Sequence, residues 1–344
     1  MDVLWYASIG ISVLFAYIFG SLVPYVWRKR RDRAILQRNF PAPAAAHWLL
    51  GHVPLLSGLS YETLMLFSRW TKEYPRYYLF MAGPLETKLF LNHADTIKQL
   101  TKTHEPKQFG FGGVYRFILP AIGDGILCSS GDKWHRNRKL LTPAFHFDAL
   151  KGYVPVVNES ALKLIDKLEK LSTNTGKSVD LSDPIRLCSL DLVMRTAFSS
   201  STDVQAQGDI DTFVRSIDFM TEQVVKRVIT PLYHFDSWYN RTQAGKQFYQ
   251  SAQCVSDVAT AVINQRRLEL AQSKVGDNKS TGKCLDFLDR LLMARDEDGN
   301  GLSRDDILDE VRTFMIGGHD TTTGAIIWLI YNLAKHRQCQ DLAR

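Results

Sequence analysis

The sequence predicts a mainly α-helical fold with a small β part near its start and one N-terminal transmembrane helix. Three observations predict it: an uncharged run over Val3–Val23, two short aromatic and aliphatic runs on either side of Gly83 and Pro84, and long amphipathic stretches from Lys133 onward. The chain of 344 residues is 45% hydrophobic and 23% charged. These globular values exclude disordered, collagenous and low-complexity scaffolds.

The run Val3–Val23 is long enough to cross a bilayer. As a helix its 21 residues would span about 31 Å, close to a hydrocarbon core of about 30 Å. Asp2 precedes the run and a basic cluster, Arg28–Arg33, follows it, which is the reverse of a cleaved signal peptide. The positive-inside rule then puts the downstream body in the cytosol. We expect a membrane anchor over residues 1–27, with a buried core helix as the alternative, and a basic, proline-containing hinge over residues 28–59.

Charge and cysteine usage exclude two further classes of protein. The formal net charge is +6, but Arg28–Arg33 holds five positive and one negative side chains, or +4, which leaves +2 for the rest. This distribution gives no support to a nucleic-acid partner, so we expect no nucleic acid to bind. The five cysteines are scattered and form no C-x-x-C pair, so we expect reduced thiols, no disulfide framework and no metal site.

Local patterns predict the elements of the body in order. Ser60–Tyr74 has the apolar spacing of a helix, and Tyr77–Met81 and Thr87–Leu91 predict the two strands of a hairpin. The longer amphipathic stretches predict helices over Leu150–Leu171, Pro184–Phe198, Ile210–Val228, Gly245–Gln272 and Cys284–Arg295.

A long helix is predicted near the end of the sequence. Asp296–Gly301 imitates the first half of a calcium loop, but Arg304 and Ile307 stand at its ninth and twelfth positions, so a solvated turn is the preferred interpretation. Ser303, with an acidic residue three positions on, resembles a capping box that opens a helix running to about His336. A helix of that length must cross the whole core.

The middle of that helix carries an unusual segment, Gly317–Thr323, with the sequence GGHDTTT. Adjacent glycines cost about 1 kcal/mol each relative to alanine, and β-branched threonines lose rotamer freedom, so the segment predicts a local break or kink. Asp320 and Thr321 would then place an acid and a hydroxyl in a buried location suited to proton delivery to a bound oxygen species. The alternative is a packing kink whose hydroxyls bond to the helix itself.

A second candidate site is the pair Trp134 and Arg138, four residues apart in GDKWHRNRKLL. On a helix these two share a face, so an indole N–H and a guanidinium converge on one point. Such a pair suits an anionic oxygen group such as a carboxylate. The alternative is a surface tryptophan stacked by an arginine.

Taken together, these segments resemble the cytochrome P450 superfamily, and specifically its family 4. The resemblance rests on the anchor, on Phe40–Pro43 with His47–His52, on Gly123–Phe147 and on Leu291–His336. Order, spacing and flanking residues agree with the family throughout. The resemblance implies a cytochrome P450 fold, incomplete at its C-terminus, with a catalytic domain over residues 60–344.

The resemblance also implies roles for individual residues. In the family, the residues matching Trp134 and Arg138 bind a haem propionate, and those matching Gly317 and Gly318 shape the oxygen pocket. The acid and alcohol matching Asp320 and Thr321 relay protons for cleavage of the O–O bond, so these two are the candidate catalytic residues. An aromatic stretch lies where the family has a substrate-contacting loop, with ordinary core aromatics as the alternative interpretation: Phe109, Phe111, Tyr115 and Phe117.

Family 4 members typically hydroxylate fatty acids and related lipids near the chain end. The resemblance therefore implies a haem-thiolate monooxygenase with haem b and a lipid or fatty-acid substrate. Electrons would come from NADPH through a membrane-bound partner, NADPH-cytochrome P450 reductase. It also implies a single-pass protein of the endoplasmic reticulum membrane with its body facing the cytosol.

The sequence departs from the family pattern in two places, which bear on how haem would be attached and on whether the chain is active alone. Gly317 stands where family 4 often has a glutamate that esterifies the haem, so we expect any haem to be held non-covalently. None of the five cysteines has the Phe-x-x-Gly-x-Arg-x-Cys context of the family's axial ligand, so we expect the amino-terminal part of such an enzyme, inactive alone. The alternative is a haem-free, membrane-anchored interaction or decoy protein.

Overall fold

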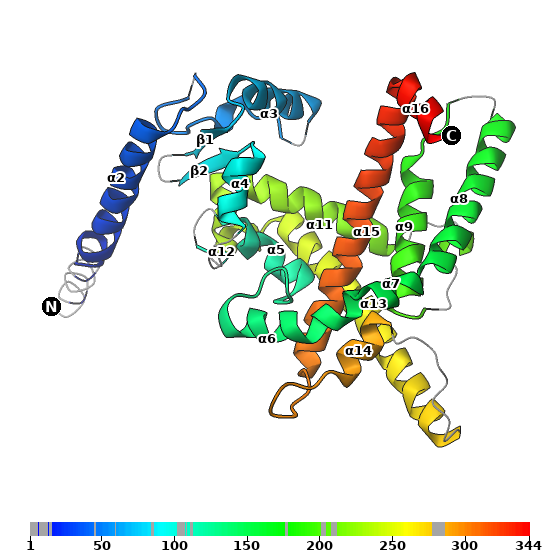
Figure 1. The fold of residues 1–344 in the computed structure, drawn as a ribbon. Coiled ribbons are helices and arrows are strands. Elements are labelled where there is room, and N and C mark those ends of the chain that lie inside the picture. The colour runs from blue at the N-terminus through cyan, green and yellow to red at the C-terminus, as the bar shows by residue number, and fades with distance from the viewer. Residues whose placement is uncertain are drawn as a thin grey trace. The chain divides into compact units, whose positions relative to one another are not determined.

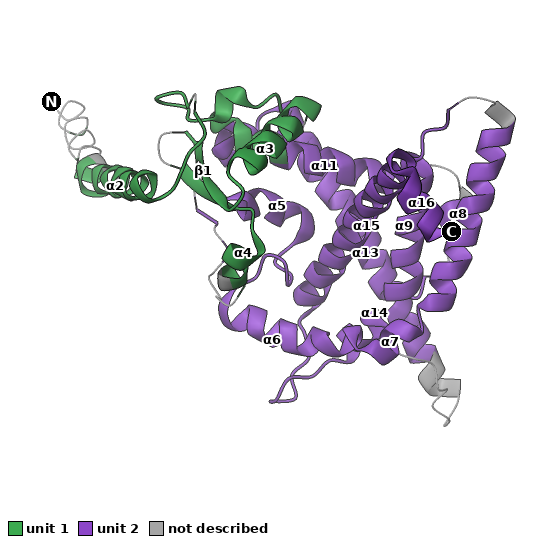
Figure 2. Cartoon of the chain, turned by 45° about the horizontal axis from the view of Figure 1, so that its top comes forward, with its two compact units in different colours: residues 1–105, 225–231 green, residues 106–224, 232–344 purple. Residues whose placement is uncertain are grey.

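The computed structural model describes two compact units, coloured separately in Figure 2. The first unit comprises residues 1–105 and 225–231, and the second comprises residues 106–224 and 232–344. The described residues are 6, 13, 16–44, 46–58, 60–83, 86–101, 107, 109–110, 113–175, 178–200, 204–207, 212–276 and 286–344.

Helices dominate the described part of the chain, which confirms the predicted fold class (Figure 1). From the start of the chain to residue 100 the elements are η1 (Ile18–Leu22), α2 (Val23–Asn39), η2 (Val53–Leu55), α3 (Tyr61–Glu73), β1 (Tyr77–Ala82), β2 (Glu86–Leu91) and α4 (Ala94–Leu100). Those that follow are α5 (Val114–Ile122), α6 (Gly131–Leu141), η3 (Thr142–Phe145), α7 (Phe147–Lys151), α8 (Val154–Thr175), α9 (Ser182–Ala197), α10 (Val204–Gln207), α11 (Thr212–Ile229), η4 (Pro231–His234), α12 (Asp236–Tyr239), α13 (Gln243–Gly276), α14 (Phe287–Met293), α15 (Arg304–Lys335) and α16 (Arg337–Ala343).

The first unit is built on the hairpin of β1 and β2, which are antiparallel with Tyr77 opposite Leu91. The aromatic side chains of Trp70, Tyr78 and Phe80 form its core, because α3 packs its buried tryptophan on the hairpin. An amphipathic helix explains this arrangement, together with a first strand that is buried at four consecutive positions. The predicted helix and hairpin are thus both confirmed.

About half of the predicted anchor Val3–Val23 lies outside the described residues, which include only residues 6, 13 and 16–23 of this run. The basic cluster Arg28–Arg33 belongs to α2, which ends at Asn39, shortly before two prolines that cannot continue a helix. In the described part of the chain, no helix combines the length and the apolar character needed to cross a bilayer. The boundaries at residues 27 and 59 stay predictions.

The second unit is organised around α15, which packs against α9, α13, α5 and α14 (orange to red in Figure 1). Ser303 begins this helix by accepting a hydrogen bond from the Asp306 N–H at 3.0 Å. A serine at this position satisfies one of the free N–H groups of the first turn. The predicted long helix and its N-cap are confirmed. The turn before it is confirmed too, since Asp296 Oδ1 accepts the N–H groups of Asp298 and Asn300.

The predicted break at Gly317 and Gly318 is wrong, because α15 is helical from Arg304 to Lys335 without interruption. Packing and hydrogen bonding account for this segment instead. Close packing against α9 accounts for one glycine, since a Cβ at Gly318 would lie 2.8 Å from Cγ2 of Val193. The hydroxyl of Thr321 donates to the carbonyl of Gly317 at 2.6 Å, so the hydroxyl binds an intact turn rather than a freed carbonyl.

Candidate functional site

Helix α6 carries the predicted anion-binding pair. Trp134 and Arg138 lie one turn apart on this helix, and Trp134 is half-buried while Arg138 is exposed. Sequence reasoning missed a second cation beside this pair, since the ammonium of Lys107 lies 5.3 Å from the centre of the Trp134 ring. A cation over an aromatic face is stabilised by the ring's quadrupole. This contact is also what the alternative interpretation describes, a surface tryptophan stacked by a basic side chain, so binding of an anion by Trp134 and Arg138 stays a prediction.

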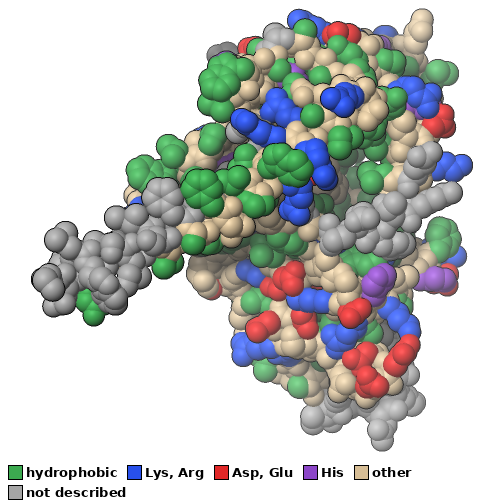
Figure 3. Space-filling model, turned by 90° about the vertical axis from the view of Figure 1, so that its left-hand side faces the viewer, with side chains coloured by type: hydrophobic (Ala, Val, Ile, Leu, Met, Phe, Trp, Pro, Cys, Tyr) green, Lys and Arg blue, Asp and Glu red, His purple; other side chains and the backbone are tan. Residues whose placement is uncertain are grey.

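Other charges of α6 are neutralised by acidic residues. The ammonium of Lys133 lies 3.0 Å from Asp124 and 3.1 Å from Asp306, and Arg136 lies 3.1 Å from Asp296. The lower half of Figure 3 shows acidic and basic side chains interspersed in this way. Among the described residues, no carboxylate lies within ion-pair distance of Arg138, so its charge stays available to an external anion.

A buried carboxylate fixes α6 against α15. Glu310 of α15 accepts hydrogen bonds from the side-chain amide of Asn137 at 2.9 Å and from the N–H of Ile126 at 3.0 Å. Burial raises the pKa of Glu310 above its ordinary value, and the two donors offset part of that effect. Neither Glu310 nor Asn137 was predicted. In the sequence, Glu310 is only an acidic residue on the long helix and Asn137 an amide near Trp134. The spacing between them does not mark them as partners.

The loop before α6 lies directly on α15. The Thr313 hydroxyl donates to the Ile122 carbonyl at 3.1 Å, and the Asp309 carboxylate accepts from the Asp124 N–H at 3.0 Å. Gly125 allows this approach, because a Cβ there would come within 2.5 Å of the Thr313 hydroxyl and 2.9 Å of the Asp309 carbonyl. The string GDG at residues 123–125 therefore serves close backbone packing.

The two glycines of α15 face different surroundings. Gly318 faces α9 and Val193, so packing alone accounts for it. A Cβ at Gly317 would have no described heavy atom within 4 Å, so no neighbour requires a glycine at that position. Gly317 lies seven residues beyond Glu310, about 10 Å along the helix axis. The structure thus joins α6 to the first turns of α15, and places the open glycine about two turns further on.

Asp320 and Thr321 were expected in a buried location, and this expectation is wrong because both are exposed. They lie three and four residues after Gly317, so all three share the face of α15 that points away from α9. The opposite face carries His319, which is 2% exposed and bonded to α9. Sequence reasoning could not separate these faces, because it did not know which side of the helix α9 covers.

The aromatic stretch divides between core and partly exposed positions. Phe117 is buried in the core of the second unit and makes an edge contact with His234, with ring centres 5.1 Å apart. Phe109 and Tyr115 are half-buried, with ring centres 6.2 Å apart. Phe111 lies outside the described residues. The core interpretation thus fits Phe117, and contact of the others with substrate stays a prediction.

The family model for cytochrome P450 matches residues 41–344, and the chain therefore belongs to the cytochrome P450 family. Its relatives place it in family 4. Cytochrome P450 4F12 of Homo sapiens is 36% identical over 311 residues, covering 89% of this chain and 58% of the relative. Cytochrome P450 4F3 of Rattus norvegicus is 35% identical over 342 residues, covering 98% and 63%. Leukotriene-B4 omega-hydroxylase 3 of Mus musculus is 34% identical over 332 residues, covering 96% and 63%. The chain spans about three fifths of the length of these relatives.

The family implies haem, and the described residues fit that group in two respects. Trp134, Arg138 and Lys107 would supply an N–H donor and positive charge for a propionate. Gly317 leaves the exposed face of α15 free of a side chain where a flat ring could approach. Among the described cysteines, Cys128 and Cys188 are buried, and burial raises the pKa of each thiol to about 11. Both are thus protonated at neutral pH and offer no thiolate.

Proposed function

We propose that this chain supplies the propionate anchor and the oxygen-side helix of a haem monooxygenase that hydroxylates fatty acids or related lipids. The observation that carries the proposal is Gly317, which no neighbour requires, on the same exposed face as Asp320 and Thr321. Membership of family 4 and the similarity to a leukotriene omega-hydroxylase support the lipid substrate.

Each of these residues has a definite task in this proposal. The Trp134 indole and the Arg138 guanidinium hold a propionate, which fixes the orientation of the ring. When bound, haem supplies the oxidising chemistry that inserts oxygen into a C–H bond. The exposed carboxylate of Asp320 takes protons from solvent, and the Thr321 hydroxyl passes them toward the face beside Gly317 after leaving its bond to the Gly317 carbonyl.

The proposal extends to the cellular setting of the protein. Family 4 membership supports a place on the endoplasmic reticulum membrane and electrons from NADPH through NADPH-cytochrome P450 reductase. The uncharged run Val3–Val23 and the basic cluster Arg28–Arg33 support a single-pass anchor with the body in the cytosol.

Titration of the full chain with haemin, followed by the Soret absorbance, tests the site. We expect saturable binding that Arg138→Ala weakens by about tenfold, because a charge-assisted hydrogen bond is lost. Lys139→Ala is the matched control, since it removes an exposed cation of the same helix whose partner is Glu297. Equal affinities in the wild type and Arg138→Ala would refute the anchor, and absence of binding would favour a haem-free interaction protein.

The lipid part of the proposal has its own measurement. With haem bound, dodecanoate and arachidonate should shift the Soret band in a saturable way, because a ligand beside the ring changes its surroundings. Leu substituted for Gly317 should abolish that shift by filling the open face. A shift that survives Gly317→Leu unchanged would place the lipid elsewhere.

A further inference from the structure

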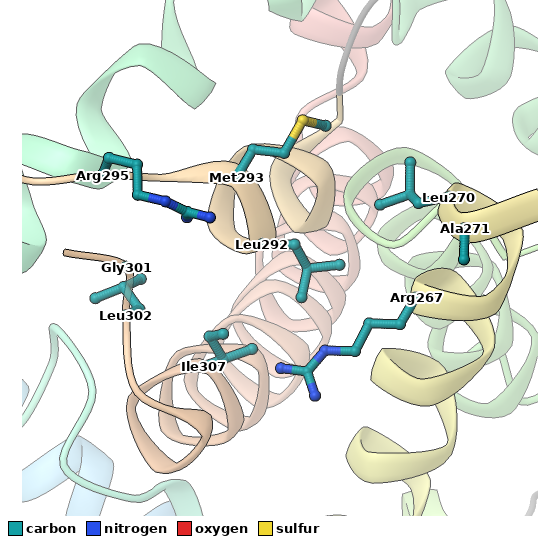
Figure 4. A pocket seen from close by; sticks show the side chains of 9 residues that line it. All are labelled: Arg267, Leu270, Ala271, Leu292, Met293, Arg295, Gly301, Leu302 and Ile307. Atoms are coloured by element: carbon teal, nitrogen blue, oxygen red, sulfur yellow. The ribbon is translucent and has the colours of Figure 1, made fainter. Parts of the chain in front are cut away.

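A cavity of about 690 Å³ lies at the start of α15 (Figure 4). It is open to the surface and is lined by residues of α13, α14, the turn before α15 and the first turn of α15 itself. Its volume is that of a small-molecule site, for which roughly 300 to 1,000 Å³ is usual. Ile307 in its wall precedes Gly317 by ten residues, which is about 15 Å along the helix axis. The cavity is therefore distinct from the candidate haem site.

Two arginines enter this cavity from different elements. Arg267 comes from α13 and Arg295 from the turn after α14, and both guanidinium groups point into the interior (Figure 4). No acidic side chain belongs to the described lining. The neighbouring Arg266 is different, because it is held by both oxygens of Asp289 at 2.7 and 2.8 Å. One arginine of the pair thus stabilises the fold, and the other is left for a ligand.

The position of Arg295 is fixed by its surroundings. Its Nη1 donates to the carbonyl of Ala294 at 2.7 Å, and a Cβ at Gly301 would lie 3.1 Å from the same atom. The absence of a side chain at Gly301 leaves room for the guanidinium, which lines the pocket. A guanidinium has five N–H donors in a planar fork that matches carboxylate and phosphate oxygens.

The other side chains that line the pocket are apolar, although backbone and guanidinium groups contribute much of its surface. Leu302 and Ile307 are buried, and Leu270 and Leu292 are half-buried beside them. Two guanidinium groups above an apolar floor suit a molecule with an anionic head and a hydrocarbon chain. We propose that this cavity binds a small anionic amphiphile, with a carboxylate or phosphate head between Arg267 and Arg295 and an alkyl chain on this floor. The proposal is independent of the haem site and does not rest on it.

Photo-crosslinking of the full chain in phosphatidylcholine nanodiscs tests the proposal. The probe is dodecanoate with a terminal diazirine, and labelled peptides are mapped by mass spectrometry. We expect labelling within residues 267–271 and 292–307. Unlabelled dodecanoate or monododecyl phosphate should compete, and whichever competes at the lower concentration identifies the head group. Dodecanol has no charge and should not compete.

Variants distinguish the contribution of the two arginine charges to binding from that of the space in the pocket. The double substitution Arg267→Ala with Arg295→Ala should reduce this labelling by about tenfold or more, because charged hydrogen bonds are lost. Ala271→Trp keeps both charges and should reduce labelling by filling the cavity; Ala271 is exposed, so the fold should tolerate the larger side chain. Lys246→Ala removes an exposed cation at the other end of α13 and should leave labelling unchanged.

The outcomes that overturn the proposal are equally specific. Labelling that the double variant retains in full, or that dodecanol competes away as well as dodecanoate does, would show that the arginines recognise no anion. Labelling confined to other segments would show that the amphiphile binds elsewhere. Arg138→Ala should leave labelling of this cavity unchanged, so failure of the haem proposal and failure of this one are separable.

Discussion

The hydroxyl of Ser189 on α9 lies 3.0 Å from Nδ1 of His319 on α15. The same hydroxyl lies 2.6 Å from the Thr323 hydroxyl, which in turn donates to the His319 carbonyl at 2.9 Å. All three residues are buried, so this network sets how α9 and α15 pack. His319 immediately precedes Asp320, so the register of the proposed proton-transfer face is fixed from the opposite side of the helix.

Substitution of Ser189 by alanine should destabilise the fold by about 1 to 3 kcal/mol, because the imidazole and the Thr323 hydroxyl lose a buried partner. Urea denaturation followed by circular dichroism measures the loss. Ser172→Ala, at an exposed position of α8, is the matched control and should stay within about 0.5 kcal/mol of the wild type. Equal losses in the two variants would show that the network contributes nothing specific.

The stability of the protein should depend on pH through His319. Burial lowers the pKa of this imidazole to about 4, against about 6.5 in an unfolded chain, while Asp320 opposes and Arg186 reinforces the shift. Between these values the unfolded state binds more protons, so stability rises with pH. The contribution, about 3 kcal/mol, is fully present above about pH 6.5 and is lost as the pH falls toward 4.

The comparison that isolates this effect uses His319→Gln, whose side chain does not titrate. Unfolding free energies of the wild type and the variant, measured between pH 7.5 and pH 4, should converge as the pH falls. Parallel curves would mean that His319 keeps its protonation state on unfolding. Other buried acids affect both proteins alike and cancel in the difference.

The two glycines of α15 should respond in opposite directions to alanine. Gly317→Ala meets no described neighbour and should stabilise the protein by up to about 1 kcal/mol through helix propensity. Gly318→Ala places a methyl group 2.8 Å from Cγ2 of Val193, a stiff side chain, and should cost about 1 to 2 kcal/mol. Thermal unfolding of the pair provides the measurement, and each variant is the other's control. The same sign for both would contradict the assignment of the faces.

The sequence predicted the elements well where the pattern is local, and less well where neighbours decide. The hairpin, the helix capped by Ser303 and the extent of α15 follow from residue periodicity and capping chemistry. The break at Gly317 and Gly318 was predicted from propensity, but the packing of α15 on α9, which Gly318 contacts, outweighed it. Trp134 and Arg138 were proposed because their spacing is helical, and their role stays a prediction. Glu310 was not, because its two donors come from residues more than 170 positions away.

Glu310→Gln should destabilise the protein and weaken haemin binding together. The carboxylate accepts from the Asn137 amide and the Ile126 N–H with its two oxygens, whereas an amide has one oxygen and would turn its NH₂ group toward a donor. One buried donor is then left unpaired, at a cost of about 1 to 3 kcal/mol. Because these bonds join α6 to α15, Trp134 and Arg138 should also be held less firmly in position.

Urea denaturation and haemin titration measure the two effects. Glu297→Gln, an exposed acid paired with Lys139, is the control and should change neither. A variant that loses stability but binds haemin like the wild type would show that Glu310 does not position the propionate anchor.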